Sequence, residues 1–440
     1  MENSKKLKLG SCVTILIGAM FGSAIFSLSG LTIFEAGPAA LISWIAAAPI
    51  MLIYGLITAE LASYFPKSGG VYVFPARAMQ GKHGQFWGWI SCWGFILGNF
   101  AAIAFSAIYV GVYLGVAFND VSNFQIPIAL ISLLICLIVN VVNLKTTGKV
   151  NSVLVICLLI IMSVFIGTTI TNQSFDLANF VPFFGRGNSG DFGFISMVPT
   201  AILSYSSIVT IAFMASEIEK PHRAIPMSCI IAIVFIAILY ALIIFSTLGV
   251  VSCEFLEQHP DLKMIPIFAA CSQLANAEWL TPLISIASVL ALITTMLVMV
   301  TINARAIQAA AEDKILPRQL AYTAKNGQPI NSVIVCVIIS AIITLFPNYV
   351  SEIINFGILF NLITIFIVVI SLFMARKSCD VMKDGFKLPG GKVLPIIFLV
   401  ILFGCGVVNV VTSNSMMIFI YTIMLLAIGV IIFLLTDHQK

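Results

Sequence analysis

Long apolar segments that are almost free of charged residues recur along this sequence, and they constrain its fold more than any other feature. Each is near or above the length of about 20 residues that a helix needs to cross the hydrocarbon core of a bilayer. Transmembrane β-strands would instead alternate in shorter segments of about ten residues. The sequence therefore predicts an all-α integral membrane protein with twelve transmembrane helices. They cover residues 9–34, 38–59, 85–118, 125–143, 150–170, 192–215, 227–251, 280–304, 329–346, 353–375, 393–412 and 414–435.

The composition supports this class and limits the partners. Hydrophobic residues make up 60% of the chain and charged residues 9%, whereas a soluble domain carries about 25% charged residues. No polar linker separates independent cores, so we expect residues 1–440 to form a single membrane domain surrounded by lipid. The basic residues lie in short loops and not along one stripe, which argues against a nucleic-acid partner.

The same basic residues predict the orientation of the chain in the membrane. If the N-terminus lies in the cytoplasm, every one of the 22 lysines and arginines except Arg186 and Lys263 falls on the cytoplasmic side. The acidic residues divide evenly between the two sides, so the bias is the positive-inside pattern. We therefore expect both termini in the cytoplasm and the protein in the cell membrane.

Two of the predicted spans contain small polar residues at mid-depth. Residues 22–24 of the first span read Gly-Ser-Ala, and residues 204–207 of the sixth read Ser-Tyr-Ser-Ser. Non-helical backbone is tolerated at that depth only where protein buries it or it lines a cavity. Interruptions at matching positions of two five-helix halves indicate a transporter built from inverted repeats, with its site at the bilayer midplane. The alternative is that these small residues simply let helices pack closely.

Catalytic chemistry finds no support in the sequence. No acidic or basic residue lies well inside a predicted span, and Glu60, at the inner end of the second, comes nearest. The histidines and cysteines show no metal-ligand spacing, and nucleophile and phosphate-loop motifs are absent. We therefore expect no enzyme, no cofactor and no metal. Cys253 and Cys271 share one predicted loop, and sequence spacing leaves open whether they form a disulfide.

Four stretches resemble motifs of the amino acid–polyamine–organocation superfamily of permeases. They are GAMFGSAIF at 18–26, AELASYFPKSGGVYVF at 59–74, SYSSIVTIAFMASEIEKPHRAIP at 204–226 and NARAIQAAAEDKILPRQL at 303–320. The resemblance implies the leucine-transporter fold with a 5+5 inverted repeat. Residues 9–170 and 192–375 would form the two repeats, and residues 393–435 two peripheral helices.

The resemblance also implies a substrate site at the two interruptions. In the family, backbone amides of the first span hold the substrate carboxylate, which implies Ser23, Ala24 and Ile25 here. Backbone carbonyls of the first and sixth spans hold its amino group, which implies Met20, Leu203 and Ser206. Amides at a helix N-terminus suit an anion, and unwound carbonyls suit an ammonium. Tyr205 is large enough to close one side of the pocket. The residues expected to bind substrate are Met20, Gly22, Ser23, Ala24, Ile25, Asn99, Leu203, Tyr205, Ser206, Ser207 and Met299.

Two of these residues bear on the substrate's side chain. GNFAAIAF at 98–105 resembles the arginine/agmatine and lysine/cadaverine antiporter branch, in which the asparagine, here Asn99, faces the substrate. The alternative is that Asn99 binds a neighbouring helix. That branch places a tryptophan against the cationic group where this chain has Met299. Methionine offers little cation–π attraction, so this position favours a neutral substrate over a cationic one.

Departures from the family pattern bear on ion coupling. Proton-coupled members carry a lysine where this sequence has Leu158, and leucine cannot titrate. Thr294 and Thr295 offer oxygen ligands for sodium, but paired threonines more often bond back to their own helix. The predicted function is therefore exchange of amino acids or their decarboxylated amines by alternating access. Alternatives are a proton- or sodium-coupled symporter and a non-transporting amino acid receptor. The sequence leaves open whether the protein forms a homodimer.

Overall fold

The computed structural model describes residues 6–67, 69–118, 124–142, 144–324, 327–378, 385–412 and 416–437. These residues form helices α1 to α17, linked by loops and short 3₁₀ segments. In the described part of the chain the β-pairing is a single parallel bridge between Leu7 and Ile218. The prediction of an all-α protein is confirmed.

Nine helical segments in the described residues are long and apolar enough to cross a membrane. The apolar helices Leu9–Met20, Ile330–Thr344 and Ile420–Thr436 are shorter than this. Three predicted spans are therefore missing from this count. The first divides into two helices, and its second half runs on into the next span, whereas the spans predicted at 329–346 and 414–435 correspond to the other two short helices. The ends predicted at Asn143 and Asn414 lie outside the described residues.

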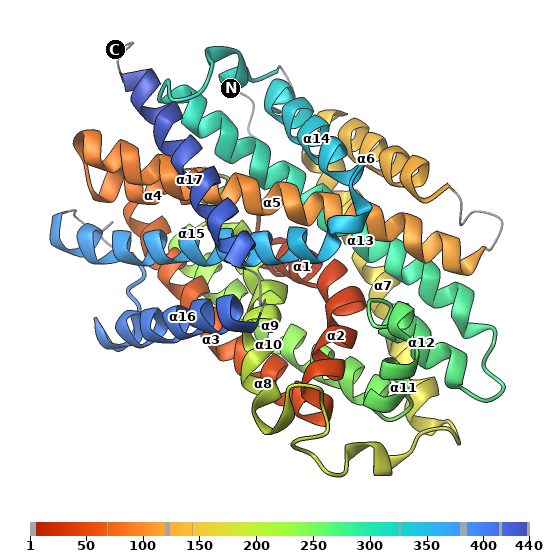
Figure 1. The fold of residues 1–440 in the computed structure, drawn as a ribbon. Helices are drawn as coiled ribbons and strands as arrows, with labels where there is room; N and C mark the ends of the chain where they lie inside the picture. The colour runs from red at the N-terminus through yellow and green to blue at the C-terminus, as the bar shows by residue number, and fades with distance from the viewer. Residues whose placement is uncertain are drawn as a thin grey trace.

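The long helices follow the predicted apolar segments. Their bounds are α3 Ala40–Tyr64, α5 Gly81–Ala117, α6 Gln125–Val142, α7 Leu144–Thr171, α10 Pro221–Leu248, α13 Leu280–Glu312, α14 Ile330–Thr344, α15 Val350–Ser378, α16 Val393–Thr412 and α17 Met416–Asp437. Figure 1 shows α5 and α15 side by side, and α5 packs against both α13 and α15. Exposed isoleucines and valines on α6, α7 and α16, such as Ile131, Ile160 and Val400, suit a lipid surrounding.

The first span breaks where the sequence predicts. Helix α1 (Leu9–Met20) ends before Phe21, and α2 (Ser23–Ala36) begins after Gly22, whose φ of −138° and ψ of −146° are not helical. A Cβ on residue 22 would lie 1.8 Å from Oγ1 of Thr295 on α13. Only glycine therefore fits between the break and α13.

The sixth span differs from the prediction. Helix α9 (Val198–Tyr205) continues directly as the 3₁₀ helix η5 (Ser206–Glu217), and Ser206 keeps helical φ and ψ of −60° and −26°. The first non-helical angles come later, at Met214. The expected loss of helix at residues 204–207 is therefore wrong, because the backbone there tightens from α to 3₁₀ geometry without unwinding.

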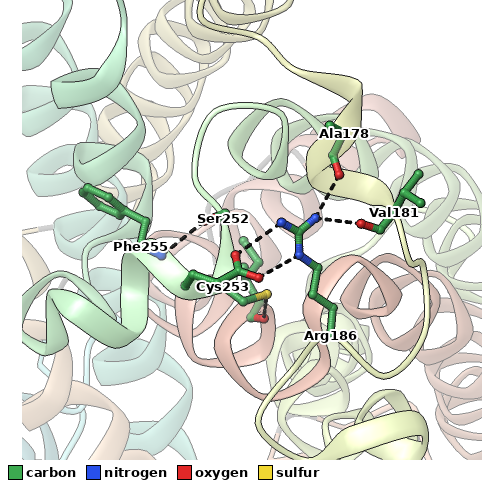
Figure 2. Close-up of polar contacts among 8 residues, drawn as sticks. Ala178, Val181, Arg186, Ser252, Cys253 and Phe255 are labelled. Atoms are coloured by element: carbon green, nitrogen blue, oxygen red, sulfur yellow. Dashed lines mark hydrogen bonds and ion pairs between the residues drawn. The ribbon is translucent and has the colours of Figure 1, made fainter.

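Two loops join at one end of the helices, around Arg186 (Figure 2). Its guanidinium donates to both carboxylate oxygens of Glu254, at 2.9 and 3.3 Å, and to the carbonyls of Ala178 and Val181, at 2.9 and 3.1 Å. This ion pair holds the pKa of Glu254 below its usual value. The segment before α9 is thereby fastened to the short helix α11 (Cys253–Gln258).

The cysteine pair left open by the sequence does not form a disulfide. Cys253 and Cys271 are both free thiols. The Cys253 thiol instead donates to the carbonyl of Ile33, 3.3 Å away on α2. Burial raises the pKa of Cys253 to about 11, so the thiol stays protonated at neutral pH.

The opposite ends of the helices are joined by ion pairs. Arg376 on α15 donates to both oxygens of Glu60 on α3, at 2.8 and 2.6 Å, and the Leu388 amide donates to the same carboxylate at 2.8 Å. Glu217 at the end of η5 pairs with Arg305 on α13. These contacts tie the second and sixth spans to α15 and α13 at this end.

Candidate functional site

A cavity of about 90 Å³ lies where the break in the first span and the junction of α9 with η5 meet α5, α13 and α15. A single water needs roughly 10–15 Å³ on this measure, so the cavity has room for a small solute. Nine of the predicted residues line it, namely Met20, Gly22, Ser23, Ala24, Asn99, Leu203, Ser206, Ser207 and Met299. The structure thus brings residues far apart in the sequence around one space, and whether they bind substrate stays a prediction.

Ile25 and Tyr205 do not line this cavity. Both side chains are fully buried in the protein core. The Tyr205 hydroxyl donates to the Trp44 carbonyl at 3.1 Å, and its ring packs edge-on against Tyr240 with centroids 5.2 Å apart. Tyr205 therefore packs the sixth span against α3 and α10, and it is not the pocket wall that the sequence suggested. Ile25 can take part only through its backbone.

The start of α2 offers backbone N–H groups to the cavity. The first N–H groups of any helix lack intrahelical acceptors. The Ser23 amide donates to Oγ1 of Thr295 at 3.0 Å, which fixes the helix N-terminus against α13. The positive end of a helix dipole stabilises an anion. The geometry thus fits the expected carboxylate position near Ser23 and Ala24.

The expected ammonium site at Met20 is less favourable. The Met20 carbonyl accepts hydrogen bonds from the Tyr240 hydroxyl and from the Gly22 amide. A carbonyl oxygen has two lone pairs. In this conformation both are used, so the Met20 carbonyl has none left for an ammonium. The Leu203 carbonyl accepts a hydrogen bond from the Ser206 amide, where α9 meets η5.

The threonines considered as sodium ligands bond to their own helix. The hydroxyls of Thr294 and Thr295 both donate to the carbonyl of Ala291, at 2.8 and 2.9 Å. The Thr295 oxygen also accepts the Ser23 amide. The two threonines therefore bond back to their own helix, which the sequence analysis gave as the alternative to binding sodium. In the described part of the chain, no group of three or more His, Cys, Asp or Glu residues is placed to hold a metal ion.

Asn99 lines the cavity and also contacts a neighbouring helix. Its Nδ2 lies 3.5 Å from Oδ1 of Asn303 on α13. Asn303 in turn donates to the Ile96 carbonyl at 3.4 Å. The Asn99 amide is therefore partly engaged between α5 and α13 while the residue lines the cavity, and its contact with the substrate stays a prediction.

The sequence reasoning missed one whole wall of the cavity, which is supplied by α15. The lining residues of this helix lie on one face, at Ile353, Ile354, Gly357, Asn361 and Thr364. Their spacing is that of one helical stripe. The available signal was the pair of polar residues on that stripe within an otherwise apolar span.

The cavity lining carries no formal charge. Among the described residues around it there are hydroxyls, amides and apolar side chains, but no acidic, basic or histidine side chain. Leu158, at the position where proton-coupled members carry lysine, is fully buried in α7. A ligand here would be held by backbone groups and neutral polar side chains.

A small uncharged cavity enclosed by apolar membrane-length helices is the arrangement of a solute transporter, not of an enzyme. The chain belongs to the amino acid permease family, whose sequence model matches residues 7–434. It is thus a multi-pass membrane protein of an amino acid transport family in the amino acid–polyamine–organocation superfamily. Membership implies a leucine-transporter-like fold.

Several curated relatives are similar at low identity. The branched-chain amino acid permease BcaP of Bacillus subtilis is 28% identical over 90% of this chain and 86% of its own length. The aspartate-proton symporter of B. subtilis is 27% identical over 58% of this chain and 49% of its own length. The serine/threonine exchanger SteT of B. subtilis is 23% identical over 58% and 57%. Exchangers and symporters both occur among the relatives, so similarity does not assign the branch.

Proposed function

We propose that this protein is a secondary transporter of small neutral amino acids that exchanges one substrate for another by alternating access. The observation that carries the proposal is the uncharged cavity between the first and sixth spans, lined on one side by the N-terminus of α2. That N-terminus suits a carboxylate. A decarboxylated amine has none, so the amines that the sequence also allowed lose support.

Neutrality of the substrate follows from the lining. A charged side chain entering this cavity would leave water without meeting a partner of opposite charge, which is costly. Most of the lining is apolar, with Met299, Ala102 and Ile302 among it. The similarity to a branched-chain amino acid permease over most of the chain agrees with a neutral substrate.

Exchange is favoured over proton coupling because the described cavity lining has no acidic, basic or histidine side chain. The carboxylates nearest the spans, Glu60 and Glu217, are both engaged in ion pairs with arginines. Proton symport is the second candidate, and the similarity to an aspartate-proton symporter is the observation that favours it.

The proposal includes the architecture expected from the sequence. Residues 1–440 form one membrane domain, with inverted repeats at 9–170 and 192–375 and two peripheral helices in 393–435. Both termini lie in the cytoplasm. A homodimer is not part of the proposal.

Uptake into proteoliposomes tests both substrate and coupling. Purified protein is reconstituted, and initial uptake of labelled neutral, acidic and basic amino acids and of amines is measured with and without unlabelled substrate inside. We expect rapid uptake of neutral amino acids only with internal counter-substrate. Concentrative uptake into vesicles holding buffer alone, driven by a pH gradient and abolished by a protonophore, would refute exchange. Preference for amines or charged amino acids would refute the substrate class.

A further inference from the structure

Asn361 on α15 is a polar residue that lines the cavity and takes no part in the contacts described above. Gly357 on α15 and Gly98 on α5 both line the cavity and lie at the crossing of the two helices, where an added Cβ on either would come within 4 Å of the other's carbonyl oxygen. Small residues at such crossings let helix backbones approach closely. Asn361 follows one turn after Gly357, so this close crossing brings its side chain to the cavity wall.

The Asn361 amide differs from the other polar groups near it. The Thr364 hydroxyl, also on α15, donates to the Ser91 carbonyl at 3.2 Å, and the Asn99 amide contacts Asn303. The side-chain amide of Asn361 has no hydrogen-bond partner among the described residues, and the residue is only partly buried. An amide has two donor hydrogens and an acceptor oxygen. All of them are available to whatever fills the cavity.

We propose that Asn361 is a specificity-determining residue, and that it selects neutral amino acids with a side-chain hydroxyl over apolar ones of the same shape. The inference rests on the proposed function. Asn99 and Met299 line the same cavity. A substrate that fills the cavity must hydrogen-bond to the Asn361 amide or leave it unpaired and out of reach of water.

Threonine and valine form the pair of substrates that isolates this effect. They have nearly the same shape, and a hydroxyl in threonine replaces a methyl in valine. A site that hydrogen-bonds a substrate hydroxyl discriminates against the analogue that lacks it. For one neutral amide we expect threonine to be preferred over valine by roughly tenfold, which corresponds to about 1.4 kcal/mol.

The test is the ratio of initial exchange rates for threonine and valine at low concentration in proteoliposomes. Asn361→Leu replaces the amide by an apolar group of similar size, and Asn361→Ala removes it without filling the space. We expect either variant to lower the threonine-to-valine ratio about tenfold, chiefly by a gain in valine transport. Ser371→Ala is the control on the same helix. Ser371 does not line the cavity and its hydroxyl donates to the Val368 carbonyl at 2.6 Å, so the ratio should stay at the wild-type value.

Two results would overturn the inference. An unchanged ratio in both Asn361 variants would show that the amide does not meet the side chain. An equal loss for both substrates would place Asn361 at the carboxylate or amino end, or in helix packing. If the wild-type protein exchanged no neutral amino acid at all, the proposed function itself would fail, and this inference with it.

Discussion

Replacing Gly22 by alanine tests the role of the first-span break most directly. The new Cβ would lie 1.8 Å from Oγ1 and 3.1 Å from Cβ of Thr295, so α2 and α13 must separate by well over an ångström. This separation also removes the 3.0 Å bond from the Ser23 amide to Thr295. Overpacking costs about 1–3 kcal/mol and a lost hydrogen bond about 1 kcal/mol.

We therefore expect Gly22→Ala to lower the free energy of unfolding by about 2–4 kcal/mol. It should also weaken substrate binding, because it displaces the N-terminus of α2 that lines the cavity. The assay is substrate-induced thermal stabilisation of purified protein, with exchange in proteoliposomes as a second readout. Thr295→Ala in the same chain removes the closest atom and should recover part of the loss.

Gly10→Ala is the control for the Gly22 variant. Gly10 also lies on α1, but an added Cβ there meets nothing within 4 Å. Its binding and transport should match the wild type. Wild-type affinity in Gly22→Ala would refute the reasoning, because the break would then tolerate a side chain that the geometry excludes.

Three further outcomes follow from the described contacts. Ala24→Leu should abolish substrate binding in a folded protein, because the larger side chain fills much of a cavity of about 90 Å³; retained binding, measured by thermal shift, would move the site elsewhere. Glu60→Gln should lower the free energy of unfolding by about 2 kcal/mol, since a carboxylate accepting three hydrogen bonds is lost; chemical denaturation in detergent measures this. The pKa of Glu254 is lower in the folded protein than in the unfolded chain, so its ion pair with Arg186 stabilises at neutral pH and is lost as pH falls through the folded value. Arg186→Gln should remove this acid-side dependence of the thermal unfolding temperature, at a cost of at most about 1 kcal/mol for so exposed a pair.

The elements that the sequence predicts well are those set by local composition. Apolar runs place the helices, and the break at Gly22 follows from a small residue at a depth where backbone needs protein cover. The orientation of Tyr205 was not predictable in this way, because it depends on Trp44 and Tyr240 in other helices. The 3₁₀ geometry after Ser206 could not be predicted from the sequence either, because a run of serines is compatible with an unwound helix and with a tightened one.

The α15 wall shows a different limit of sequence reasoning. Asn361 and Thr364 lie only three residues apart in one apolar span. The Thr364 hydroxyl donates to the Ser91 carbonyl, whereas the Asn361 amide has no partner among the described residues. Which of two polar residues is free depends on helix crossings that bring residues hundreds of positions apart into contact. Gly98 and Gly357 make that crossing, and Gly357 lies outside every motif that the sequence shares with the permease family.

The pairing of Leu7 with Ile218 has a mechanical consequence. The Leu7 amide donates to the Glu217 carbonyl at 2.8 Å, and the Glu219 amide donates to the Leu7 carbonyl at 2.9 Å. Leu7 lies two residues before the start of α1, and Ile218 directly follows η5. The start of the first span and the end of the sixth are thus joined by two backbone hydrogen bonds. A tilt of either half-helix at this end pulls the other along unless both hydrogen bonds break, at about 1 kcal/mol each. The first and sixth spans are therefore mechanically coupled at this end of the molecule by the two hydrogen bonds of Leu7.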